Sequence, residues 1–229
     1  MRAVRSGHII FGALLIRATL FAQAPASEHP VVINFIADVN SDSVNTLVRI
    51  INDQVIKGNH KITILISSGG GQTAPALAAY NLLRHMSSLE LTTFNIGNVD
   101  SAAMLLYCAG AHRYSLPGPG TRFLIHGNAM NPPVGVPIDV TFWESQVQLL
   151  KSLNEMTVRV IAEASNDRRS DIEAAVHSQK ILSPELAKEW GIVQDIREDF
   201  MPPGATFIAV NVPEQGQKRP PDFVSITSQ

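Results

Sequence analysis

The apolar residues of this chain follow two spacings, and each spacing predicts a different kind of element. Short runs rich in Val, Ile and other apolar residues predict strands at 31–39, 61–67 and 89–97. Stretches with apolar residues every three or four positions predict helices at 41–58, 73–86, 101–111, 140–165, 170–178 and 183–191. Because strands and helices alternate along the chain, the pattern predicts an α/β fold with a mostly parallel sheet.

The remaining segments predict a turn, an extended arm and a tail. Residues 112–126 contain a turn and a short strand, and residues 128–139 are too rich in proline for a helix. The C-terminal part is proline-rich and polar, with one apolar run at 206–212 that predicts an added strand. We therefore expect one folded domain over 27–200 and a partly disordered tail over 201–229.

The N-terminus has the three parts of a secretory signal peptide. Two arginines precede an apolar stretch at 9–22, and small residues at 24–26 provide a cleavage site. The apolar stretch is short for a membrane span, and Arg17 interrupts it. The pattern predicts that residues 1–26 are a signal peptide and that the protein is periplasmic or secreted. The alternative is an ordinary first helix, which would leave the protein in the cytoplasm.

The composition argues against several classes of function. The formal charge is only −2 and lysine and arginine form no cluster, so the sequence does not favour a nucleic-acid partner. The single cysteine, Cys108, rules out internal disulfides and a cysteine-rich metal site, and its apolar neighbours predict that it is buried. His85, His112 and His177 show no metal-ligand spacing, so we expect neither a metal nor another cofactor.

Three polar features lie at the ends of predicted strands. The first is the sequence SSGGG at 67–71, whose glycines let the backbone approach a ligand and expose N–H donors. It lacks the Gly-Lys-Ser/Thr ending of a phosphate loop and the glycine spacing of a dinucleotide site. The alternative is a simple tight turn.

Ser101 and His126 are the other two features. Ser101 lies between a predicted strand and a predicted helix, where the N–H of Ala102 can face an oxyanion near the helix dipole. The alternative is that Ser101 or Asp100 merely caps the helix. His126 ends an apolar strand, which suits a general base at neutral pH, although a histidine there can also be purely structural.

In combination these features resemble the Clp protease proteolytic subunit family, within the broader Clp/crotonase fold superfamily. The resemblance covers about residues 31–197, and the stretches that carry it are ILISSGGG…ALAAYNLL, SAAMLLYCAGAHRYSLP, RFLIHG, LLKSLNEM and ILSPELAKEWGIV. The separation of 25 residues between Ser101 and His126 equals that of the family's nucleophile and base. The resemblance implies repeated β-β-α units, a mostly parallel sheet and a protruding handle within about 127–165.

The resemblance also implies a role for each candidate residue. Ser101 would be the nucleophile and His126 its general base, and the oxyanion hole would consist of the N–H groups of Gly70 and Ala102. A peptide would bind as an added strand, and the residues that would line it are Gly69, Gly71 and Gly127. The handle would join two stacked homo-oligomeric rings, and neither a cofactor nor a coenzyme is implied.

The sequence departs from the family pattern at three places. Gln179 stands where the family has the acid of its catalytic triad. An amide can orient an imidazole but carries no charge to stabilise its protonated form, so we expect low activity. Lys180, the next residue, is an alternative base. Asp100 replaces a small apolar residue and could stabilise a protonated His126. The predicted signal peptide displaces the segment that docks the family's ATPase, so an exported protein is not expected to have an ATPase partner.

We therefore hypothesise a serine endopeptidase that cleaves short or unfolded peptides through an acyl-enzyme on Ser101. The alternative is a catalytically weak or inactive oligomer of the same fold that binds peptides or partner proteins, and Gln179 favours it. A crotonase-like thioester enzyme is a third hypothesis, but it needs a coenzyme A pocket, for which the sequence contains no signal.

Overall fold

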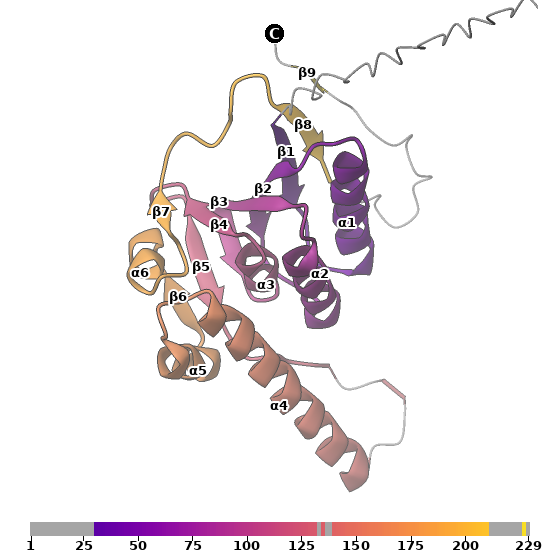
Figure 1. The fold of residues 1–229 in the computed structure, drawn as a ribbon. Coiled ribbons are helices and arrows are strands. Elements are labelled where there is room, and N and C mark those ends of the chain that lie inside the picture. Colours follow the sequence, from indigo (N-terminus) through magenta and orange to yellow (C-terminus); the bar gives the residue numbers. More distant parts are fainter. Residues whose placement is uncertain (1–29, 132–133, 136–138, 211–225, 228–229) are drawn as a thin grey trace, which may run out of the picture.

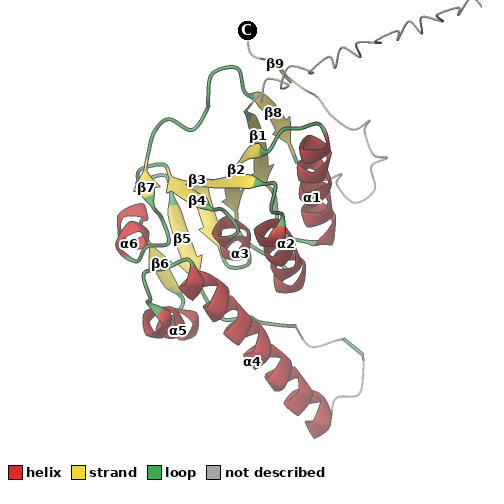
Figure 2. Ribbon diagram, in the orientation of Figure 1, coloured by secondary structure: helices red, strands yellow, loops and turns green. Residues whose placement is uncertain are grey.

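The protein folds around one large sheet with helices packed against it (Figure 1, Figure 2). The computed structural model describes residues 30–131, 134–135, 139–210 and 226–227. The predicted signal peptide, residues 1–26, and most of the predicted tail lie outside the described residues. Among the helices that are described, none has both the length and the apolar character needed to cross a membrane.

The elements follow one another in alternating order for most of the chain. They are β1 (Val31–Ile36), α1 (Ser41–Ile56), β2 (Lys61–Ser68), α2 (Thr73–His85), β3 (Glu90–Asp100), α3 (Ala103–Cys108), β4 (His112–Ser115), β5 (Arg122–Ile125), α4 (Val140–Glu163), α5 (Arg169–Ser178), β6 (Lys180–Leu182), α6 (Pro184–Glu189), β7 (Asp195–Ile196), β8 (Thr206–Ala209) and β9 (Ile226–Thr227). Each predicted helix and strand is present, with its ends within a few residues of the prediction except at β1, α3 and β3.

Two differences from the predicted elements matter for the site. β3 continues to Asp100, three residues beyond the predicted end, and therefore leads directly into Ser101. The segment predicted to be a turn contains β4, whose local sequence, HRYS, gives no clear strand signal. β4 is a strand because its backbone pairs with β3 on one side and with β7 on the other, so long-range pairing determines its conformation.

The sheet runs in the order β6-β5-β3-β2-β1-β8-β9, while β4 and β7 branch from β3. All pairs are parallel except β5–β6 and β8–β9. This confirms the predicted mostly parallel α/β fold and the predicted added strand at β8. Because parallel strands end at the same edge of a sheet, the segments that follow β2, β3 and β5 come together there.

Apolar side chains cover both faces of the sheet. On one face, alternate residues of β1 such as Ile33 and Phe35 belong to the main core beneath α1, α2 and α3 (Figure 2). On the other face, Val32, Leu65 and Phe94 form a smaller cluster with residues of the C-terminal segment. The alternation of β1 between two apolar clusters explains why all of its residues except Asn34 are apolar.

Helix α4 projects from the body of the protein (Figure 1), as expected for the handle. Its buried residues all lie near its C-terminal end, at Thr157, Val158, Val160 and Ile161. That end is fixed by Arg113, whose guanidinium donates hydrogen bonds to the carbonyls of Gly110, Ala164 and Ile192 at 2.9–3.1 Å. The helix therefore has a rigid base and a projecting part with exposed apolar side chains, which include Trp143, Val147 and Leu149.

Cys108 is buried in α3, as predicted. Burial raises the pKa of its thiol to about 12, so the thiolate does not form near neutral pH. The cysteine is therefore a core residue and not a candidate nucleophile.

Candidate active site

A bend in β3 positions the first candidate residue. Between the pairs Ile66–Asn95 and Ser68–Val99, β3 contains two more residues than β2, so the strand changes direction at Gly97. A Cβ atom at Gly97 would lie 2.5 Å from Ser67 Oγ, which leaves room only for glycine. The first half of β3 pairs with β4 and the second half pairs with β5.

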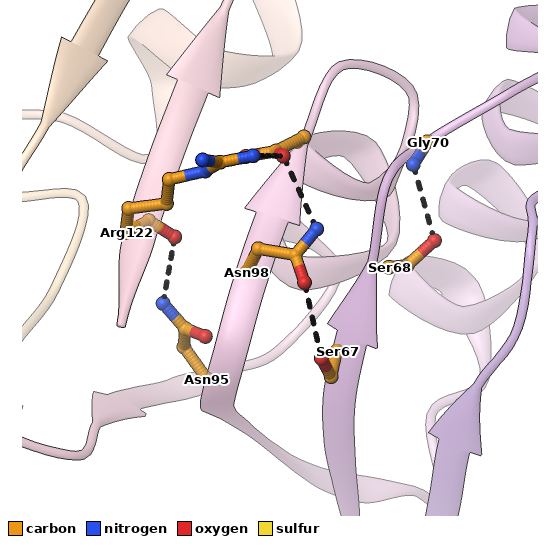
Figure 3. Close-up of polar contacts among 7 residues, drawn as sticks. Ser67, Ser68, Gly70, Asn95, Asn98 and Arg122 are labelled. Atoms are coloured by element: carbon orange, nitrogen blue, oxygen red, sulfur yellow. Dashed lines mark hydrogen bonds and ion pairs between the residues drawn. The ribbon is translucent and has the colours of Figure 1, made fainter. Parts of the chain in front are cut away.

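The buried side chain of Asn95 replaces the backbone hydrogen bonds that this bend removes. Its Oδ1 accepts from the Gly97 N–H and its Nδ2 donates to the Arg122 carbonyl, both at 3.0 Å. Asn95 therefore joins the bend to the first residue of β5 (Figure 3). This contact fixes β3 and β5 relative to each other a few residues before Ser101 and His126.

Ser101 forms a sharp turn between β3 and α3. Its φ is +56°, a left-handed conformation that is strained for a residue other than glycine. Its N–H donates to the Leu124 carbonyl at 2.8 Å, which holds the turn against β5. Within the described ranges, Ser101 Oγ has no hydrogen-bond partner.

The capping alternative for this position is wrong. The residue before α3 is Ala102, and no side chain accepts a hydrogen bond from the first turn of the helix. The N–H of Ala102 likewise makes no hydrogen bond to the described part of the chain. An unpaired hydroxyl and an unpaired N–H donor thus stand next to each other in the sequence.

The glycine-rich loop lies directly against this turn. Gly70 has φ +88°, and a Cβ atom there would lie 2.6 Å from Ser101 Cβ and 3.1 Å from the Ala102 nitrogen. At Gly71 (φ +142°) a Cβ would collide with the Val39 carbonyl. The loop is also paired with Val39 through two hydrogen bonds of 2.7 Å, so it is an extended segment and not a simple tight turn.

The Gly70 N–H already has a partner in the structure. It donates to Ser68 Oγ at 3.2 Å (Figure 3), a long hydrogen bond with a neutral acceptor. A negatively charged oxygen is a stronger acceptor than a hydroxyl, so this donor can change partners when an anion forms beside Ser101.

The pairing of β3 with β5 brings His126 to the same edge of the sheet. Asp100 is paired with Leu124; Ser101 comes one residue after Asp100, and His126 comes two residues after Leu124 on the adjacent strand. The imidazole is half-buried, and its Nδ1 lies 2.7 Å from the Gly127 carbonyl oxygen. Because a carbonyl only accepts, Nδ1 carries the proton in this hydrogen bond, and Nε2 of the neutral ring is then the acceptor.

Gln179 reaches the same edge from the other side of β5. The antiparallel ladder of β5 and β6 ends at the pair Ile125–Lys180, and His126 and Gln179 are the next residues beyond that pair. Gln179 ends α5 with φ +56°, and its side chain is exposed and makes no hydrogen bond to any described residue. In this conformation the Gly127 carbonyl, and not the Gln179 amide, contacts the imidazole.

The model of the Clp protease family matches residues 29–199 of this chain, which include every residue of the site. The chain belongs to the Clp protease family. It is 30% identical over 137 residues to ATP-dependent Clp protease proteolytic subunit 1 of Rhodococcus jostii, a match that covers 60% of each chain. The corresponding proteins of Cutibacterium acnes and Thermobifida fusca are 28% and 26% identical, over 62% and 69% of this chain and 65% and 70% of theirs. The chain thus spans 60–65% of the length of the first two relatives.

This Clp protease family member has an ion pair beside Ser101 that the sequence analysis missed. The Asp100 carboxylate is buried and accepts from Arg122 Nη2 at 2.8 Å and from Asn98 Nδ2 at 3.1 Å. Asn98 also accepts from Ser67, so a row of polar side chains crosses β2, β3 and β5 (Figure 3). The carboxylate raises the pKa of Arg122, and its charged partner is this arginine and not His126.

We expect the Arg122→Met variant of the protein to be less stable to urea by about 1–3 kcal/mol. Methionine keeps much of the apolar stem but leaves the buried Asp100 carboxylate with one amide donor. The double variant Asp100→Asn/Arg122→Met removes the charge as well and should recover part of this loss. Equal unfolding midpoints for the single and double variants, at one protein concentration, would contradict an ionic role for the pair.

The described part of the chain contains no group of three or more His, Cys, Asp and Glu side chains that could hold a metal ion. The groups that the structure describes around the Ser101 turn include a hydroxyl, an imidazole and backbone N–H donors.

Proposed function

We propose that the protein is a serine peptidase of the Clp proteolytic-subunit class, which hydrolyses peptide bonds through an acyl-enzyme on Ser101. One observation carries the proposal. Ser101 stands in a strained turn against the backbone of Gly70 and at the same sheet edge as His126, and its Oγ is unpaired among the residues that the structure describes. Strained turns of this kind occur at functional sites, and membership of the Clp protease family is consistent with a nucleophile here.

The proposed reaction uses only groups of this chain and the substrate. His126 Nε2 accepts the Ser101 hydroxyl proton while Oγ attacks the carbonyl carbon of the peptide bond. The N–H groups of Ala102 and Gly70 donate hydrogen bonds to the resulting oxyanion, and the Gly70 N–H gives up its hydrogen bond to Ser68 Oγ to do so. The intermediate expels the amine, which takes the proton from His126, and water then hydrolyses the ester by the same steps.

The substrate is proposed to be a short or unfolded peptide in extended conformation. It would add as a strand beside Gly69 and Gly71 of the loop and Gly127 of the arm. Thr73, just after the loop, donates a hydrogen bond to the Asn128 side chain in the arm, so the two sides of this binding region are connected. We also propose that the protein forms homo-oligomeric rings through α4, and that residues 1–26 direct its export, so that it acts without an ATPase.

A fluorophosphonate probe tests the proposal directly. The full-length protein is treated with the probe, and the adduct is located by peptide mapping. The expected result is one adduct per chain on Ser101, because the probe reacts with a serine that has a base and an oxyanion hole. An adduct at another serine would contradict the proposal, and so would an unmodified protein.

Gln179 is exposed and has no hydrogen-bond partner among the described residues, which favours a second candidate, a weakly active or inactive oligomer that binds peptides. The Gln179→Asp variant distinguishes the two. A carboxylate at this position would stabilise the imidazolium, so peptidase activity should rise at least about tenfold on a panel of short fluorogenic peptides. If neither form hydrolyses the panel but both bind its peptides, the binding function is correct.

A further inference from the structure

The group that contacts His126 is part of a peptide unit that α4 holds in place. The Gly127 carbonyl accepts from His126 Nδ1 at 2.7 Å. The N–H of Asn128 belongs to the same planar peptide group and points to its opposite side. This N–H donates to Asn154 Oδ1, also at 2.7 Å, so each end of the peptide group makes one short hydrogen bond.

Asn154 lies in α4, near the base of the projecting helix. Its Oδ1 accepts a second hydrogen bond of 2.9 Å from the Asn128 side chain, which also contacts Thr157 of α4 at 3.4 Å. A Cβ atom at Gly127 would lie 3.5 Å from the Asn154 amide and 3.3 Å from the Val176 carbonyl, so the peptide is packed closely against α4 and α5. Asn154 acts only as an acceptor in these contacts.

The position of this peptide group determines how the imidazole can act. A planar peptide that is fixed at its N–H has a fixed carbonyl direction. That carbonyl in turn selects the Nδ1–H tautomer of His126 and leaves Nε2 as the acceptor, which is the form a general base requires. Gln179, at the position where the family resemblance places an acid, makes no such contact.

We propose that Asn154 is a positioning residue for His126, which acts through the peptide group between Gly127 and Asn128. This peptide carbonyl takes the orienting role of the missing acid, although as a neutral group it does not stabilise an imidazolium charge. The consequence for hydrolysis rests on the proposed peptidase function, whereas the tautomer of His126 does not depend on it.

The tautomer is measured by nitrogen NMR of sedimented full-length protein with ¹⁵N-labelled histidine, with the His126→Gln variant to assign the signals. We expect a protonated Nδ1 and an unprotonated Nε2 in the natural sequence. Asn154→Asp retains the acceptor oxygen and should retain this pattern. Asn154→Leu removes the acceptor at similar volume, so the Nε2–H form should appear. An unchanged His126 spectrum in Asn154→Leu would overturn the proposal.

The rate of fluorophosphonate labelling at Ser101 provides the second readout. Asn154→Leu should slow labelling about 10- to 100-fold, and Asn154→Asp should recover it to within about fivefold of the natural sequence. Asn52→Leu, the same substitution at an exposed position of α1, is the matched control and should label normally. If Asn154→Leu fails to fold, as judged by thermal melting, Asn154→Ala serves in its place.

The two readouts separate this proposal from the peptidase proposal. If the natural protein is not labelled, the peptidase function fails and the NMR comparison alone decides the role of Asn154. If labelling slows equally in Asn154→Asp and Asn154→Leu with the tautomer unchanged in both, Asn154 is a structural residue of α4 and the proposal is wrong.

Discussion

The Ser101→Ala variant is expected to lose fluorophosphonate labelling completely and to hydrolyse peptides at least about 1,000-fold more slowly than the natural protein. The substitution removes the only hydroxyl at the turn between β3 and α3. The N–H donors of Gly70 and Ala102 remain, so weak binding of peptides should persist. Labelling by mass spectrometry and hydrolysis of a fluorogenic peptide provide the two measurements.

The strain at Ser101 supplies a control for this variant. Alanine has the same left-handed penalty as serine, so Ser101→Ala should melt at nearly the same temperature as the natural protein. Ser101→Gly relieves that penalty and should be more stable by about 1 kcal/mol, yet equally unreactive. Ser87→Ala, in an exposed turn, should leave labelling unchanged. Labelling that persists in Ser101→Ala would refute the nucleophile assignment.

The Gly70→Ala variant is expected to reduce labelling at Ser101 by about 100-fold or more. A methyl group at residue 70 would lie 2.6 Å from Ser101 Cβ and 3.1 Å from the Ala102 nitrogen, so the loop or the turn must move. Either movement separates the two N–H donors from the hydroxyl. We also expect a loss of stability of about 1–3 kcal/mol from crowding and from the positive φ.

Gly58→Ala is the matched control for this substitution. Gly58 has the same φ of +88°, but a Cβ atom there meets nothing within 4 Å. Gly58→Ala should therefore lose about 1 kcal/mol of stability and label at the normal rate. If both variants label normally, the close approach of the glycine-rich loop to Ser101 has no part in reactivity.

The parts of the fold that local sequence determines could be predicted. The apolar spacing of 41–58 and 61–67 depends on neighbouring residues only, and α1 and β2 lie where it places them. β4 could not be predicted, because its sequence is compatible with a turn and its pairing with β3 and β7 decides its conformation. The bend in β3 has only a weak local signal, which is the glycine at position 97 within the strand.

The candidate site likewise contains some residues that the sequence could identify and others that it could not. Ser101, His126 and the glycine loop stand at element ends, where periodicity and a family resemblance can find them. The roles of Arg122, Asn98 and Asn154 could not be found, because each has a hydrogen-bond partner far away in the sequence and their residue types are common on surfaces. Gln179 was located by counting within a motif, but only coordinates show that its side chain faces solvent.

The smaller apolar cluster has a practical consequence for where the chain can be shortened. The family match ends at residue 199, yet Phe200, Ala205 and Phe207 belong to this cluster, and β8 covers the side of β1 that faces away from β2. A protein truncated after residue 199 would present β1 as a long open edge of apolar, β-branched residues. Such edges pair with other chains, so this shortened form should self-associate and precipitate during expression, whereas one that ends after Val210 keeps the edge covered.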